Sequence, residues 1–166
     1  MFSIARFLAA CLVMCLVFGV LVFGMLLMNP VSFINSYPPE IQAEYYRSQS
    51  KEAARRKLTV IMGITKAAAL TAFLFLFAWM AKWAGADTFG EGLMAVYGYG
   101  LVLAVFDTCF LDWVLFPNIR RIRLPGTEHM DREYRQKWFH VKAMLPMLPL
   151  FAVGGVAAAL IMVWIW

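Results

Sequence analysis

Two charged residues of opposite sign fall inside long apolar stretches, and their spacing predicts an ion pair. Lys66 lies eight residues past Leu58, and Asp107 lies nine residues before Phe116. If the two stretches are antiparallel helices, a rise of about 1.5 Å per residue puts both charges at a similar depth. Each charge alone would cost about 2.5–3.5 kcal/mol at a membrane centre. We therefore expect Lys66 and Asp107 to pair, either as a proton- or ligand-switchable site or as a structural bond.

A second polar group begins at the end of the apolar stretch that holds Asp107. On a regular α-helix, five residues turn by about 140°, so Asp107 and Asp112 are not expected to share a face. Asp112 is instead expected near a histidine, which titrates close to neutral pH, or near the basic residues that follow. The resulting candidate site at the interface consists of Asp112, His140, Arg120, Arg121 and Arg123. A structural anchor is the alternative interpretation.

The three arginines of this group follow directly after Pro117. Such a cluster can recognise an anionic lipid headgroup or a phosphorylated substrate, since each cation near an anionic leaflet contributes about 1 kcal/mol. Ordinary anchoring by positive charges on the cytoplasmic side explains the same pattern without any ligand. Acidic residues are mixed into the same basic segments, so nucleic acid is not an expected partner.

Other reactive patterns are missing from the sequence. The three cysteines form no Cys-x-x-Cys motif. The chain has no phosphate-binding glycine loop, no His-Glu-x-x-His and no Gly-x-Ser-x-Gly. No standard metal-ligand spacing occurs among the polar residues that could converge near the interface: Asp112, Glu128, His129 and His140. We therefore expect neither a metal site nor a cofactor.

The elements that must position these residues follow from the composition. Of the 166 residues, 63% are hydrophobic and 15% are charged, and the mean hydropathy is +0.71. Soluble domains are about 45–50% apolar and about 25% charged. These values exclude a water-soluble enzyme, a disordered tail and a disulfide-stapled secreted module. They predict an integral membrane protein.

Four apolar stretches are long enough to cross a bilayer, which takes about 20 residues. They cover residues 7–28, 58–83, 92–116 and 143–166. Backbone groups in lipid must be hydrogen-bonded within their own segment, so these stretches are expected to be helices. The predicted fold is an all-α bundle of four transmembrane helices, and we expect residues 1–166 to form a single membrane domain.

The orientation follows from the positions of lysine and arginine. The segments 29–57 and 117–142 hold twelve of these residues, whereas only Arg6 and Lys82 lie on the other side. Positive charge is enriched in cytoplasmic loops. We therefore expect both long loops in the cytoplasm, both termini outside, and the inner cell membrane as the location.

Two features near the fourth stretch predict contacts. Apolar residues recur every three or four positions over 128–142, which indicates an amphipathic helix lying at the cytoplasmic interface before the fourth span. The stripe consists of Met130, Tyr134, Trp138, Val141 and Leu145. Further on, Gly154-x-x-x-Ala158 and Gly155-x-x-x-Ala159 form small-residue ridges suited to close packing against another span or a second copy of the chain.

These features support three functional hypotheses. The main one is an accessory subunit that docks a larger membrane complex, or anionic lipid of the cytoplasmic leaflet, through its helix ridges and basic loops. The first alternative is a small oligomeric transporter of protons or solutes that uses Lys66 and Asp107. The second alternative is a lipid-modifying enzyme that works at the inner interface with Asp112 and His140.

Overall fold

The structure, a computed structural model, describes residues 1–48 and 53–166, with side chains described for all of these except 53–62 and 66. It is all-helical, with 84% helix and no strand among the described residues. Four helical segments are long and apolar enough to span a membrane: Ile4–Met28, Gly63–Trp83, Phe89–Asn118 and Lys137–Ile165. The predicted all-helical character and the four apolar spans are confirmed, and they suggest a multi-pass membrane protein.

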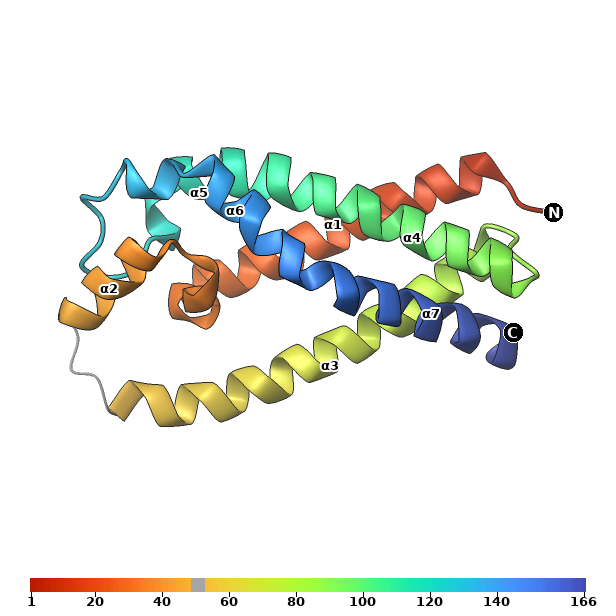
Figure 1. Cartoon of the computed structure of the whole chain (residues 1–166), viewed down its shortest axis with the longest axis horizontal. Coiled ribbons are helices and arrows are strands. Elements are labelled where there is room, and N and C mark those ends of the chain that lie inside the picture. Colours follow the sequence, from red (N-terminus) through yellow and green to blue (C-terminus); the bar gives the residue numbers. More distant parts are fainter. Residues whose placement is uncertain (49–52) are drawn as a thin grey trace. The chain divides into compact units, whose positions relative to one another are not determined.

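The described chain consists of seven α-helices and five other helical segments, joined by turns (Figure 1). The α-helices are α1 (Ile4–Met28), α2 (Pro39–Ser48), α3 (Ala53–Trp83), α4 (Phe89–Phe106), α5 (Phe116–Asn118), α6 (Lys137–Met144) and α7 (Leu148–Ile165). The short 3-10 segments are η1 (Pro30–Ser36), η3 (Arg120–Ile122), η4 (Glu133–Arg135) and η5 (Leu145–Met147). One π-helical segment, η2 (Asp107–Leu115), continues α4.

The chain divides into two compact units. Unit 1 consists of Met1–Phe18, Lys66–Val105 and Pro146–Trp166, and unit 2 of Gly19–Thr65 and Phe106–Leu145. Each unit has its own hydrophobic core.

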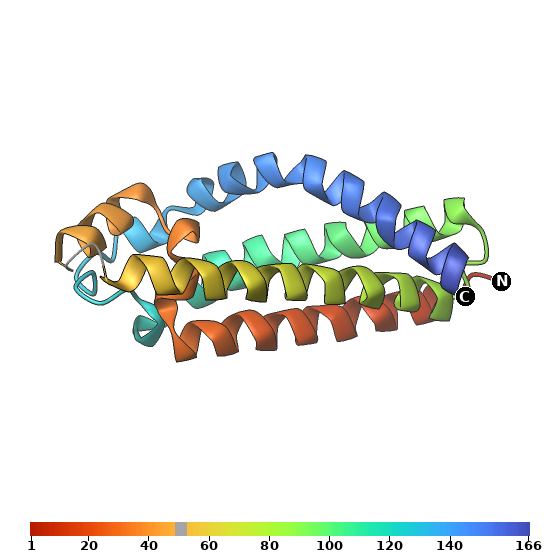
Figure 2. The same ribbon diagram turned by 90° about the horizontal axis from the view of Figure 1, so that it is seen from below.

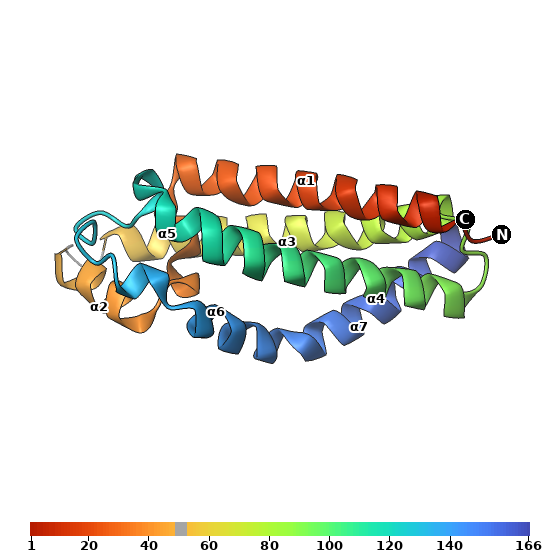
Figure 3. The same cartoon turned by 90° about the horizontal axis from the view of Figure 1, so that it is seen from above.

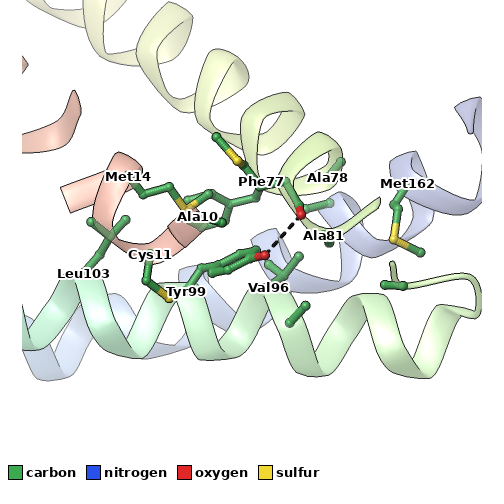
Figure 4. Close-up of a cluster of buried hydrophobic side chains, with 14 residues drawn as sticks. Ala10, Cys11, Met14, Phe77, Ala78, Ala81, Val96, Tyr99, Leu103 and Met162 are labelled. Atoms are coloured by element: carbon green, nitrogen blue, oxygen red, sulfur yellow. Dashed lines mark hydrogen bonds between the residues drawn. The ribbon is translucent and has the colours of Figure 1, made fainter. Parts of the chain in front are cut away.

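The core of unit 1 is built around Tyr99, which is fully buried on α4. Its hydroxyl donates to the carbonyl of Met80 at 3.2 Å (Figure 4). The ring of Phe7 stacks on it with a centroid distance of 4.8 Å. The first part of α1 lies beside the second half of α3 (Figures 2 and 3), where Ala10 and Met14 join the same core.

Small residues let the helices of unit 1 approach closely. A Cβ atom added at Gly155 would overlap the ring of Tyr97, and one at Gly92 would lie 2.7 Å from the terminal methyl of Met162. Ala159, which is fully buried, lies in the same contact as Gly92 and Met162. The predicted small-residue ridge of α7 therefore packs against α4 of its own chain.

The polar contacts of unit 1 gather in the turn from α3 to α4. Gly85 takes a positive φ of 93°, which suits a residue without a side chain. Lys82 pairs with Asp87 at 2.9 Å, and a carboxylate oxygen of Glu91 accepts from the backbone N–H groups of Asp87 and Thr88. This turn closes the helix hairpin and lies at the solvent-exposed surface.

The core of unit 2 is held by hydrogen bonds between loops. The hydroxyl of Tyr37, just before α2, donates to the carbonyl of Ile122 at 2.8 Å. The hydroxyl of Tyr134 accepts from the backbone N–H of Leu124 at 2.9 Å. Figure 3 shows α2 beside the loop that follows α5, and the buried Ile41 of α2 belongs to the same core as Leu124.

The predicted interfacial helix over residues 128–142 is wrong in its extent. The structure has turns and the single 3-10 turn η4 before α6 begins at Lys137. Tyr134 is only 3% exposed because its hydroxyl is bound to Thr127 and Leu124, whereas Trp138 is 74% exposed. The apolar stripe therefore does not share one face, since side-chain hydrogen bonds to nearby backbone compete with helix formation.

Candidate functional site

The candidate site lies in unit 2 and begins where α4 changes its hydrogen-bond pattern at Phe106. Over η2 the turns are wider, and at its end the N–H of Phe116 donates to the carbonyl of Leu111, five residues earlier. Pro117 contributes to this change because it has no N–H and its ring crowds the carbonyl of the residue four positions before it. Such π-helical segments are often found at functional sites.

The π-helix changes the relation between the two aspartates of this segment. On a π-helix, residues five positions apart are hydrogen-bonded neighbours, so Asp107 and Asp112 approach the same face. The prediction that they point to different faces is wrong, because it assumed the turn angle of a regular α-helix. Asp107 is close enough to both Asp112 and His140 to interact with them electrostatically.

The structure brings Asp112 and His140 into direct contact. The Nδ1 atom of His140 lies 3.2 Å from the Oδ2 atom of Asp112, and the two side chains are only 10% and 13% exposed. The histidine is the fourth residue of α6, and the aspartate lies in η2. Asp107, Asp112 and His140 are called the Asp–His site below.

Two further contacts position α6 against η2. The indole N–H of Trp113 donates to the carbonyl of Lys137 at 3.3 Å, and the ammonium of Lys137 lies over the Trp113 ring. At the other end of α6, the hydroxyl of Thr108 donates to the sulfur of Met144 at 3.7 Å. These contacts flank His140, so its ring is held next to Asp112 from both sides.

A small pocket adjoins His140. Its wall includes Ser36, Tyr37, Pro38, Phe116, Tyr134 and His140. The pocket has room for about one water molecule. Burial raises the pKa of Tyr37 and of Tyr134, so both phenols stay protonated at neutral pH. The imidazole is therefore the side chain of this wall best suited by its type to general acid–base chemistry.

The predicted arginine cluster does not gather at Asp112. Arg123 is 5% exposed, and its guanidinium is paired with Asp131. It also donates to the carbonyls of Glu128 at 2.7 Å and Pro117 at 3.3 Å. These bonds of Arg123 therefore stabilise the loop after α5.

The other two arginines of the predicted cluster, Arg120 and Arg121, are exposed. The Arg123 guanidinium holds the pKa of Asp131 below its usual range, with Arg120 adding a smaller effect. Only Asp112 and His140, of the five residues predicted at the interface, are therefore in direct contact.

The predicted pair of Lys66 and Asp107 cannot be followed in the structure, because the side chain of Lys66 lies outside the described residues. It stays a prediction. Within the described ranges, no group of three or more histidine, cysteine or acidic residues is arranged to hold a metal ion.

The pocket beside His140 was not predicted from the sequence. The run Ser36-Tyr37-Pro38-Pro39 marks the start of a helix. Nothing in it, however, indicates that Ser36 and Tyr37 meet a histidine about a hundred residues later. The sequence held one signal for the π-helix, which is the proline at position 117, directly after the predicted span 92–116.

The chain was compared with known proteins. No family model, no curated protein and no solved structure matches it. Its function must therefore be inferred from the site.

Proposed function

We propose that this chain is a small multi-pass membrane protein that takes up and releases protons through the Asp–His site. The observation that carries the proposal is the 3.2 Å contact between Asp112 and His140, with both side chains nearly buried in segments long and apolar enough to span a membrane. Ionisable groups in such segments are costly and are usually retained for ion or proton pathways.

The chemistry of the three groups suits a proton. Histidine changes charge near neutral pH, and a carboxylate beside it can accept or return the proton. With the proton on Nδ1 of His140, the neighbouring Asp112 carboxylate stabilises the imidazolium. A transfer to Oδ2 of Asp112 leaves a neutral imidazole, and Asp107 is the next carboxyl group within electrostatic range. Asp112 and His140 can therefore share one proton, with Asp107 within electrostatic range of both.

This proposal refines the transport hypothesis and shifts its centre from Lys66 and Asp107 to Asp112 and His140. We further propose that the four spans form a bundle in the inner cell membrane, with the termini outside and the basic loops in the cytoplasm. The excess of lysine and arginine in these loops supports this orientation. The Asp–His site then lies toward the cytoplasmic end of the third and fourth spans.

The other two hypotheses receive less support from particular residues. For the accessory subunit, the small-residue ridge of α7 is already occupied by Tyr97 and Met162 of the same chain. For the lipid-modifying enzyme, the pocket beside His140 is much smaller than a lipid headgroup. Binding of anionic lipid through the exposed Arg120 and Arg121 stays compatible with the proton-handling role, as does assembly into oligomers.

The test is a proton-flux measurement on the full-length protein in liposomes. A potassium diffusion potential drives protons inward, and an enclosed pH-sensitive dye reports the flux. We expect His140→Gln and Asp112→Asn each to reduce the flux by about tenfold or more, because an amide cannot accept and return the proton.

The chain supplies its own matched control. His129, the second of the two histidines, is exposed in the loop, so His129→Gln is expected to leave the flux unchanged. The proposal is wrong if wild-type liposomes carry no more flux than empty ones, or if both histidine variants behave alike.

A further inference from the structure

Resting on the proposed function, we infer that the pocket beside His140 is the port through which water reaches the Asp–His site. Its occupant would be a single water molecule that exchanges protons with the free ring nitrogen of His140. The pocket determines how protons reach the Asp–His site, whereas the proposed function is that the protein moves protons at all. Different measurements test the two.

The first observation is that the two nitrogen atoms of the imidazole ring have different surroundings. Nδ1 lies 3.2 Å from Asp112, while the same ring forms part of the pocket wall. Among the residues that the structure describes, no hydrogen bond engages Nε2. An imidazole with one nitrogen on a carboxylate and the other open to water can pass a proton across its ring.

The second observation is the composition of the pocket. Water in a cavity of this size needs two or more polar partners. Ser36 and His140 are lining residues whose side chains carry such groups, while Phe116 and Pro38 are apolar members of the lining. The hydroxyls of Tyr37 and Tyr134 are already bound to backbone at Ile122 and Leu124, which keeps the wall in shape.

Charged and titratable groups face His140 from the elements packed against it. Asp112 and Asp107 come from η2, and Tyr37 and Tyr134 come from the segments before α2 and within η4. Both phenols remain protonated. A hydronium ion in the pocket gives one O–H proton to Nε2 of His140 and is left as water, while the Nδ1–H proton moves to Oδ2 of Asp112.

Deuterium exchange at C2 of the imidazole rings tests the port with a readout independent of transport. The full-length protein in detergent is incubated in D₂O, and mass spectrometry follows each histidine over days. Ser36→Leu fills the pocket and is expected to slow exchange at His140 by about tenfold or more, because water no longer reaches the ring.

Two controls accompany this experiment. Ser36→Ala removes the hydroxyl and keeps the space, so exchange at His140 should slow less than in Ser36→Leu. His129 is exposed and gives an internal reference that no variant should change. If Ser36→Leu does not fold, as judged by gel filtration and near-ultraviolet circular dichroism, Ser36→Val fills less space and replaces it.

The outcomes separate the port from the proposed function. Equal exchange at His140 in wild type and in the folded pocket-filling variant would overturn the port, whatever the flux. Slowed exchange in a protein that carries no proton flux would support the port as a water site and reject the proposed function.

Discussion

The two units of the chain are stabilised in different ways. Unit 1 is packed from apolar and small side chains, with one buried tyrosine bond from Tyr99 to Met80. Unit 2 joins its loops through buried polar groups, above all Tyr37, Tyr134 and Arg123. The difference indicates that close packing of helix surfaces determines the structure of unit 1. In unit 2, the hydrogen bonds of buried polar groups determine it.

The location of the Asp–His site follows from this contrast. Apolar helices gain little from one another in lipid, so small residues such as Gly155 are needed for close contact. A region that already satisfies buried polar groups can also hold groups that change charge, whereas an apolar core penalises them. It is therefore consistent that Asp112 and His140 lie in unit 2, beside its hydrogen-bonded loops.

The largest effect is expected from removing Arg123. Arg123→Met leaves the carbonyls of Glu128 and Pro117 and the carboxylate of Asp131 without their donor, which should lower the free energy of unfolding by about 3 kcal/mol. Thermal unfolding in detergent, followed by tryptophan fluorescence, measures it.

The matched control for this prediction is Arg121→Met, which removes an exposed arginine of the same cluster and should change stability little. If the two variants lose equal stability, buried polar contacts do not hold unit 2, and the contrast between the units is broken.

A smaller effect is expected from removing the hydroxyl of one buried tyrosine in each unit, which compares the two units directly. Tyr37→Phe should cost about 2 kcal/mol, since the Ile122 carbonyl at the end of a single 3-10 turn loses its hydroxyl donor. Tyr99→Phe should cost about 1 kcal/mol or less, because the Met80 carbonyl also accepts from the N–H of Ala84.

The same unfolding measurement ranks these two variants. Equal losses would mean that the hydroxyl bonds contribute alike in both units, and a larger loss for Tyr99→Phe would reverse the comparison. The two changes are well matched because each removes one oxygen atom from a tyrosine that is nearly or fully buried.

The sequence predicted the long helices better than it predicted the loops of unit 2. Long apolar runs require helices, so the four spans were predicted to within six residues of their bounds. The path of unit 2 depends on contacts that no periodicity contains. Arg123 is buried because a turn at Gly126, with φ of 84°, lets the loop carbonyls meet the guanidinium. Neighbouring side-chain bonds likewise prevented a helix over 128–142.

For the candidate site, the residue types were predictable and their geometry was not. An aspartate in a predicted span and a nearby histidine are visible in the sequence, so Asp112 and His140 could be proposed as neighbours. Their relation to Asp107 depends on the π-helix, in which hydrogen bonds shift by one residue over η2. Such a shift results from the proline that follows and from tertiary packing, and hydropathy does not report it.

The smallest expected effect concerns pH and one exposed carboxylate from each unit. Arg123 lowers the pKa of Asp131 in unit 2, and Lys82 lowers the pKa of Asp87 in unit 1. A carboxyl group with a lowered pKa in the folded state stabilises the protein above the pKa of the unfolded chain, about 3.9. This stabilisation is lost as the pH falls through the lower, folded value.

We therefore expect the wild-type melting temperature to fall as the pH is lowered from about 5 to about 2, and to fall less steeply in Asp131→Asn and in Asp87→Asn. Both carboxylates are exposed, so solvent weakens each contribution. Asp131 should nevertheless have the larger share, because its partner is the buried Arg123, whereas Lys82 lies at a surface turn. Parallel curves for Asp131→Asn and wild type would show that the loop of unit 2 does not depend on this ion pair. Its stability would then rest on the uncharged bonds of Tyr37 and Tyr134.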